Sequence, residues 1–311
     1  MDADHNIFDR RLLAWRRNRA AVAALRHDFL LQRVADDLIE RLGTIRRQFP
    51  IVLHLGAHHG LLGRRLQELP GVELVIDADS SRNLLQQCSG ARVQIDEEVL
   101  PFADASLDLV VSGLALQHVN DLPGTLAQIQ RALKPDGLLL AAMLGAGSLF
   151  ELRRALLRAE EEMEAGASPR VAPFADVRDL GGLLQRAQFA LPVADADTVV
   201  VTYPNALALM RDLRGMGATN VLRARRRRPL RRATLMRAVE IYSEEFGGAD
   251  GRVPATFEIV TLTGWAPDAS QQQPLRPGSA RMRLADALGT VEQSAGAEAE
   301  PERPASDRPR K

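Results

Sequence analysis

Residues 51–60 read IVLHLGAHHG, an apolar run that ends in a turn of small residues and histidines. The run at 51–55 is long enough for a buried strand and too short for a helix. Gly56 and Gly60 allow the backbone to turn tightly and to approach a ligand closely. The stretch therefore predicts the first strand of a parallel sheet and a turn into a helix that begins near residue 61.

The alternation of strand and helix continues along the chain. Further buried or alternating runs predict strands at 73–76, 92–95, 107–111, 138–144, 197–203 and 256–265. Helical spacing of apolar residues predicts helices at 80–88, 123–133, 149–164, 178–187, 204–213 and 234–246. Strands that alternate with helices of this length favour a sheet covered on both faces, so the predicted fold class is α/β.

Composition divides the chain into three parts. Residues 1–48 carry amphipathic helical patterns and form a helical lead, and residues 49–266 hold all the predicted strands. Residues 267–311 contain few large apolar side chains, so burial cannot offset their ordering entropy, and we expect a disordered tail.

Charge and cysteine content exclude several classes of protein. The 311 residues include 40 Lys plus Arg and 40 Asp plus Glu, so the excess of positive charge that nucleic-acid binding requires is missing. The only cysteine, Cys88, cannot form an internal disulfide, which favours a reducing compartment. We find no apolar run of about twenty residues that predicts a transmembrane segment. The acidic N-terminus argues against a secretory or transit peptide, so we expect a bacterial cytoplasmic protein more than one of the mitochondrial matrix.

Ligands of parallel sheets bind at the carboxyl ends of the strands, where the loops converge. The candidate cofactor-binding residues follow the first four strands: His54, Gly56, Ala57, His58 and Gly60; Asp79 and Ser80; Asp96 and Glu97; and Ser112. A carboxylate about twenty residues after the glycine turn can bind both hydroxyls of a ribose. Gln117 and His118 are the candidate catalytic residues, because substrates approach beyond the fourth strand and histidine can act as a base near neutral pH. The alternative is that this pair packs beneath a helix.

Three features follow one another along the chain: an acid at 96, the sequence Leu-Pro-Phe at 100–102 and the sequence Asp-Leu-Val-Val-Ser at 108–112. Residues 50–145 thereby resemble the class I S-adenosylmethionine-dependent methyltransferases. The resemblance implies a Rossmann-like sheet of seven strands and S-adenosylmethionine as cofactor. It also implies that the turn at 56–60 wraps the methionine part, that Asp79 holds the ribose, that Asp96 holds the adenine amino group and that Ser112 faces the reactive end.

A second resemblance covers nearly the whole chain except the tail. It is carried by the stretches 6–10, 120–123, 179–184, 203–204, 213–217, 253–256 and 264–265. They are similar to a family of mitochondrial complex I assembly factors of methyltransferase fold whose members hydroxylate an arginine. This implies a protein partner, a complex I subunit, and hydroxylation or methylation of its arginine. A more distant resemblance to malonyl-carrier-protein O-methyltransferase implies carboxyl methylation of a carrier protein or a small molecule.

Two residues depart from the methyltransferase pattern. The family has an acid where His54 stands and a glycine where His58 stands. His58 adds a side chain where the backbone approaches the cofactor, and the imidazole of His54 supplies no full negative charge. We infer weaker binding of S-adenosylmethionine or a different ligand. The alternative is a non-catalytic assembly scaffold.

Two further patterns have a functional and a structural interpretation. His54, His58 and His59 with Asp77 or Asp79 have the composition of an iron site, but we favour strand-end and loop residues, so no metal site is predicted. The arginine-rich run at 223–232 is suited to an acidic partner such as a carrier protein or phosphate, although such runs are more often solvated loops.

Overall fold

The computed structural model describes residues 6–164, 166–272 and 282–291. Residues 1–270 form one compact unit, which includes the N-terminal helices, and residues 271–311 form a second. In the second unit the described part contains a short helix, α10 (Leu284–Leu288). A disordered tail is predicted at 267–311. Of these residues, 273–281 and 292–311 lie outside the described part, and the described remainder includes the helix α10.

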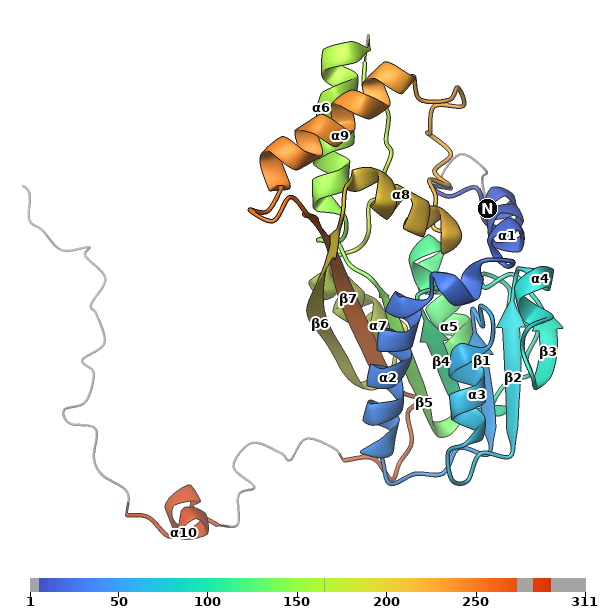
Figure 1. Ribbon diagram of the computed structural model, residues 1–311. Coiled ribbons are helices and arrows are strands. Elements are labelled where there is room, and N and C mark those ends of the chain that lie inside the picture. Colours follow the sequence, from blue (N-terminus) through green and yellow to red (C-terminus); the bar gives the residue numbers. More distant parts are fainter. Residues whose placement is uncertain (1–5, 165, 273–281, 292–311) are drawn as a thin grey trace, which may run out of the picture. The chain divides into compact units, whose positions relative to one another are not determined.

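One seven-stranded sheet runs through the first unit, with the strand order β3-β2-β1-β4-β5-β7-β6 (Figure 1). The strands are β1 (Ile51–Leu55), β2 (Leu74–Asp79), β3 (Ala91–Gln94), β4 (Leu107–Gly113), β5 (Leu133–Leu144), β6 (Ala190–Tyr203) and β7 (Val253–Trp265). Strands β1 to β5 pair in parallel, whereas β7 is antiparallel to both β5 and β6. The predicted α/β class and the seven-stranded sheet are confirmed.

Helices cover both faces of this sheet. They are α1 (Arg10–Ala20), α2 (Phe29–Gly43), α3 (Leu61–Gln67), α4 (Arg82–Leu85), α5 (Leu122–Ala132), α6 (Phe150–Met163), α7 (Val177–Arg186), α8 (Ala206–Gly215) and α9 (Arg232–Phe246). Two element lengths differ from the prediction. Helix α4 is a single turn and not the nine residues expected at 80–88, and β6 begins at Ala190, seven residues earlier than expected.

Successive residues of each central strand point to opposite faces and fill two separate cores. Val52 and Leu109 pack with Leu38 of α2 on one face. Leu53 and Val110 pack with Leu126 of α5 on the other. Because both faces of the central strands are buried, a ligand can reach the sheet only at its edges and at the ends of its strands.

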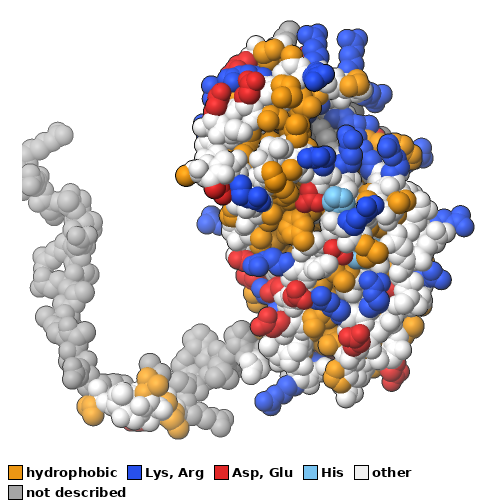
Figure 2. Space-filling model, in the orientation of Figure 1, with side chains coloured by type: hydrophobic (Ala, Val, Ile, Leu, Met, Phe, Trp, Pro, Cys, Tyr) orange, Lys and Arg blue, Asp and Glu red, His pale blue; other side chains and the backbone are white. Residues whose placement is uncertain are grey.

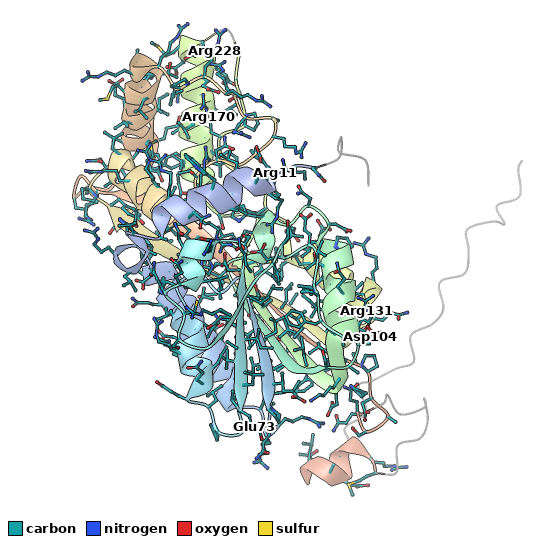
Figure 3. All side chains as sticks on the ribbon, turned by 90° about the vertical axis from the view of Figure 1, so that its right-hand side faces the viewer. Arg11, Glu73, Asp104, Arg131, Arg170 and Arg228 are labelled. Carbon is teal, nitrogen blue, oxygen red and sulfur yellow. The ribbon has the colours of Figure 1, made fainter. Side chains whose placement is uncertain are left out.

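Helix α1 lies at the carboxyl end of the parallel strands, beside α4 (Figure 1). In the view of Figure 3, Arg11 of α1 lies far from Glu73, which directly precedes β2 at the opposite end of the sheet. The side chain of Asp9 caps the helix by accepting a hydrogen bond from the backbone N–H of Leu12 at 3.0 Å. The position of α1 places its side chains over the predicted cofactor site.

No helix in the described ranges is both long and apolar enough to cross a lipid bilayer.

Candidate functional site

The turn between β1 and α3 has the conformation that its glycines predict. Gly56 and Gly60 have φ angles of 72° and 77°, in the left-handed region. A Cβ on Gly56 would lie 2.1 Å from that of Ala115, and one on Gly60 would lie 2.9 Å from the Cα of Cys88. Both glycines therefore allow neighbouring loops to approach the turn, and Ala57 between them is buried.

His58 takes the place of a third glycine and keeps a glycine-like backbone, with a φ of 51°. Its backbone N–H donates to Oδ2 of Asp79 at 2.9 Å, and its ring Nε2 lies 2.9 Å from the carbonyl oxygen of Gly113. Burial, and then the charge of Arg17, hold the pKa of His58 well below its usual value, so the ring is neutral. Because a carbonyl only accepts hydrogen bonds, Nε2 carries the proton and donates to Gly113. The imidazole thus bridges the turn after β1 and the end of β4.

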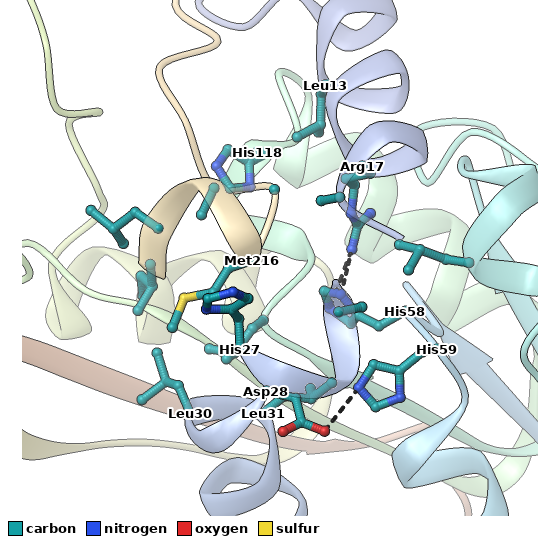
Figure 4. Close-up of a pocket in the computed structure, with 18 of the residues that line it drawn as sticks. Leu13, Arg17, His27, Asp28, Leu30, Leu31, His58, His59, His118 and Met216 are labelled. Carbon is teal, nitrogen blue, oxygen red and sulfur yellow. Dashed lines mark hydrogen bonds and ion pairs between the residues drawn. The ribbon is translucent and has the colours of Figure 1, made fainter. Parts of the chain in front are cut away.

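Two arginines of α1 bind the carboxylates of this site. Nη1 of Arg17 lies 3.5 Å from Oδ1 of Asp79 and 3.3 Å from Oε1 of Glu97. Arg10 pairs with Oδ1 of Asp96 at 2.8 Å and with the other oxygen of Glu97. The Arg17 guanidinium also donates to Nδ1 of His58 at 3.0 Å (Figure 4). The carboxylates predicted to bind ribose and adenine are therefore bound by the chain's own guanidinium groups.

His54 lies below the turn and does not reach the site. It is opposite Asp77 in the parallel register of β1 and β2, and its Nδ1 lies 2.7 Å from Oδ1 of Asp77. Both side chains are 1% exposed. Nε2 of His54 and Oδ2 of Asp77 have no hydrogen-bond partner. His54 thus forms a buried pair inside the sheet, away from the turn amides that an acid at this position would anchor.

The three histidines that were weighed as iron ligands have different partners. Nε2 of His59 lies 3.2 Å from Oδ2 of Asp28, and His58 faces Arg17 (Figure 4). His54 faces Asp77. Within the part of the chain that the structure describes, no three His, Cys, Asp or Glu side chains are grouped so that they can hold a metal ion. This ligand set is not assembled.

Beyond β4, the side chains of Gln117 and His118 line a cavity. Nε2 of Gln117 donates to the carbonyl of Leu114, whereas its Oε1 has no partner. Burial, followed by the charges of Arg17 and Arg10, lowers the pKa of His118 to about 3, so its imidazole is neutral near pH 7. The hydroxyls of Ser112 and Ser80 also have no hydrogen-bond partner. Gln117 and His118 can bond to a ligand in this cavity, whereas neither serine lines it.

The cavity has a volume of about 90 Å³ and is lined by α1, the loop before α2, the turn at 58–59 and the end of α8 (Figure 4). Pockets for small organic ligands have roughly 300–1,000 Å³. An adenosyl group that binds Asp79 would have to displace the Arg17 guanidinium, which the His58 ring also contacts. With α1 in this position, the residues of the site do not accommodate S-adenosylmethionine.

The residues that sequence reasoning missed are Arg10, Arg17 and Asp28. Arg10 and Arg17 are seven residues apart, a spacing that places both on one face of a helix. Several acids predicted at one edge of the sheet also require counter-charges when they are buried. These two signals together were present in the sequence, but they do not show which arginines meet which acids.

The fold and the site define the class of this protein. The strand order with antiparallel β7, and the acids after β2 and β3, are those of a methyltransferase-type domain, and a methyltransferase domain model matches residues 53–141. The YcgJ protein of Bacillus subtilis has the same fold, with a TM-score of 0.52 and 15% identity over 74% of this chain and 98% of that chain. A putative methyltransferase from Bacillus halodurans has a TM-score of 0.51 at 16% identity, over 75% of this chain and 99% of that one.

Sequence comparison identifies one family within this class. The chain is 40% identical to the human arginine-hydroxylase NDUFAF5, mitochondrial, over 92% of its length and 84% of that protein. It is 38% identical to the Danio rerio protein over 90% of its length and 89% of that protein. The chain belongs to the arginine-hydroxylase NDUFAF5 family, which confirms the resemblance seen in the sequence. A malonyl-[acyl-carrier protein] O-methyltransferase of Xylella fastidiosa is 33% identical over 80% of this chain and 85% of that protein.

These names correct the expected location. The prediction of a bacterial cytoplasmic protein is wrong by this comparison, because the arginine-hydroxylase relatives are named as mitochondrial proteins. That prediction was based on the acidic residues at the N-terminus. Asp9, one of its acids, caps α1 and pairs with Arg225, so it reflects the folding of a helix and says nothing of a targeting signal.

Proposed function

We propose that this protein modifies an arginine side chain of a partner protein, by hydroxylation as its relatives' names state, during assembly of respiratory complex I. The observation that carries the proposal is the set of carboxylates at the carboxyl edge of the sheet, which binds guanidinium groups. Family membership supports the same chemistry.

Glu97 is the centre of this carboxylate set. Its side chain is fully buried, and each of its two oxygens pairs with a different arginine. Charge-assisted bonds between guanidinium and carboxylate groups are strong, because both partners are ionised and their geometries match. A partner arginine that enters the site would take the position of Arg17 on Asp79 and Glu97, which requires the side chain of Arg17, or α1 as a whole, to move.

Neutral polar groups surround that position. His118 and Gln117 line the adjoining cavity, and neither adds a positive charge that would repel an incoming guanidinium. Ser112, at the end of β4, has an unpartnered hydroxyl. The side chains of His118 and Gln117 are suited to orient the uncharged part of an arginine.

Methyl transfer from S-adenosylmethionine is the second candidate function. The matched methyltransferase domain, residues 53–141, includes Asp79 and Asp96, which such a cofactor would use. It requires the same displacement of Arg17, together with movement of the His58 ring. A scaffold without catalysis is the third candidate function. It is favoured by the ion pairs that Asp79 and Asp96 already make with Arg17 and Arg10.

One experiment separates the three. Complex I subunits are isolated from a strain that lacks this protein and from the same strain supplied with the wild type or with Glu97→Gln, and each subunit is analysed by mass spectrometry. One added oxygen on an arginine, present with the wild type and lost with Glu97→Gln, is the expected result. One added methyl group would favour the transferase. An unchanged mass, with assembly restored by both proteins, would favour the scaffold.

A further inference from the structure

A second concave site lies on the other side of α1. It is a groove of about 1030 Å³ between α1, α8 and the segment 220–230, and we call it the basic groove. Figure 2 shows basic side chains gathered over this part of the surface, and Arg170 and Arg228 lie at the same end of the molecule as Arg11 in Figure 3.

Some arginines of the basic groove are neutralised by the chain itself. Arg170 pairs with Glu160, Arg225 with Asp9 at 3.2 Å and Arg226 with Glu164 at 2.7 Å. A second set lines the groove and makes no ion pair with any carboxylate of the described residues: Arg16, Arg211, Arg214, Arg227 and Arg228. In a chain with 40 basic and 40 acidic residues, this is a local excess of positive charge.

The groove also lowers the pKa of one of its own arginines. Burial is the largest cause of the lowered pKa of Arg16, and the charges of Arg225 and Arg214 add to it. The guanidinium of Arg16 donates to the carbonyl of Asn220, which carries no full charge. An anion bound here would relieve this repulsion.

The lining favours a polypeptide over a nucleic acid. Leu207, Met210, Leu230 and Leu235 alternate with the arginines, and none of the lining residues is aromatic. Single-stranded nucleic acid is bound largely by stacking of its bases on aromatic rings, which this groove does not offer. Carboxylate side chains match guanidinium forks, and apolar side chains of the same segment match the leucines.

The basic groove leads toward the candidate active site. A smaller cavity of about 220 Å³ shares Arg170, Met210, Arg214 and Asn220 with the groove. The same cavity shares His118 and Leu144 with the cavity that Arg17, His58 and Gln117 line. A chain segment held in the groove would therefore enter the site beside His118.

We propose that the basic groove docks a segment of the partner protein that is rich in Asp and Glu with interspersed apolar residues. This rests on the proposed function, and it adds that the modified arginine lies close in sequence to that acidic segment. The bound segment orients the partner, while Asp79, Asp96 and Glu97 receive the guanidinium.

The test uses a fluorescein-labelled peptide of repeating Glu-Glu-Leu and measures anisotropy with the full-length protein. The triple variant Arg214→Glu, Arg227→Glu, Arg228→Glu should bind the peptide roughly tenfold or more weakly, because each reversal replaces attraction by repulsion. The matched control is Arg46→Glu, Arg178→Glu, Arg186→Glu. It has the same net charge and alters exposed arginines for which the structure records no ion pair, so its affinity should stay within about twofold of the wild type. Circular dichroism melting checks that both variants fold.

Three results would overturn the proposal: equal losses in the two triple variants, equal binding of a peptide with Gln in place of Glu, or tighter binding of a single-stranded oligonucleotide of equal charge. The assay is independent of the chemical step. Glu97→Gln should abolish modification and leave peptide binding unchanged, so the docking and the proposed function can fail separately.

Discussion

Two faces of helix α1 use the same residue type in opposite ways. Arg10 and Arg17 lie on the face that packs onto the sheet, where buried carboxylates neutralise them. Arg16 lies on the face that borders the basic groove, where the charges of Arg225 and Arg214 lower its pKa and only Asp9, among the charged groups that act on it, raises it. The comparison shows that the role of an arginine is set by what the fold brings opposite it, and not by its place in a basic stretch.

The largest expected effect comes from removing the carboxylate that both neutralised arginines share. Glu97→Ala leaves the guanidiniums of Arg10 and Arg17 buried with fewer counter-charges, and we expect a loss of about 3 kcal/mol in the free energy of unfolding. Urea denaturation measures it. Asp104→Ala breaks an exposed pair with Arg131 and serves as control, with an expected change of about 0.5 kcal/mol. Equal losses in the two variants would show that the ion pairs of Glu97 stabilise the fold no more than an exposed ion pair does.

Opening the site should raise affinity for S-adenosylmethionine. The double variant Arg17→Ala, His58→Gly removes the guanidinium and the ring that occupy the space, and glycine suits the φ of 51° at residue 58. Isothermal titration should show roughly tenfold or greater tightening, about 1.4 kcal/mol, relative to the wild type.

The matched control for that titration is Arg16→Ala, on the other face of the same helix, which should bind the cofactor as the wild type does. Submicromolar binding by the wild type itself would mean that α1 does not obstruct the site.

The neutral histidine under α1 should make stability depend on pH. The pKa of His118 is lowered to about 3 in the folded protein, whereas an unfolded histidine titrates near 6.5. Between these values the unfolded chain binds more protons, so this contribution to stability is present above about pH 6.5 and declines as the pH falls toward 3. His118→Gln should reduce the slope of unfolding free energy against pH by about 1 kcal/mol per unit in that window. Identical slopes for variant and wild type in urea melts from pH 4 to 6 would contradict it.

The smallest effect is expected in the basic groove. Arg214 is exposed and makes no ion pair in the described structure, so Arg214→Gln removes repulsion and no attraction. The free energy of unfolding should rise or stay level, by no more than about 0.5 kcal/mol. Differential scanning calorimetry at low salt is the measurement. A clear loss of stability would show that this arginine has a stabilising partner and that the two faces of α1 are more alike than they appear.

The strands of the sheet were predictable because burial on both faces leaves a strong pattern. The runs at 51–55 and 107–111 consist almost entirely of large apolar residues, and the structure contains β1 and β4 there. The start of β6 was missed for the opposite reason. It is an edge strand whose first seven residues are exposed or half-buried and include the half-buried Asp195, so it lacks the buried apolar run that marks a central strand.

By itself the sequence determined the α/β class, the seven-stranded sheet implied by the resemblance and the presence of acids after the second and third strands. These follow from local periodicity and from the rule that loops converge at the carboxyl ends of parallel strands. Only the tertiary structure decided what those acids bind. Arg17 meets Asp79 and Glu97 across 62 and 80 positions of the chain, and His54 meets Asp77 across 23. Contacts over such separations depend on where whole elements pack, and local sequence patterns carry no record of that.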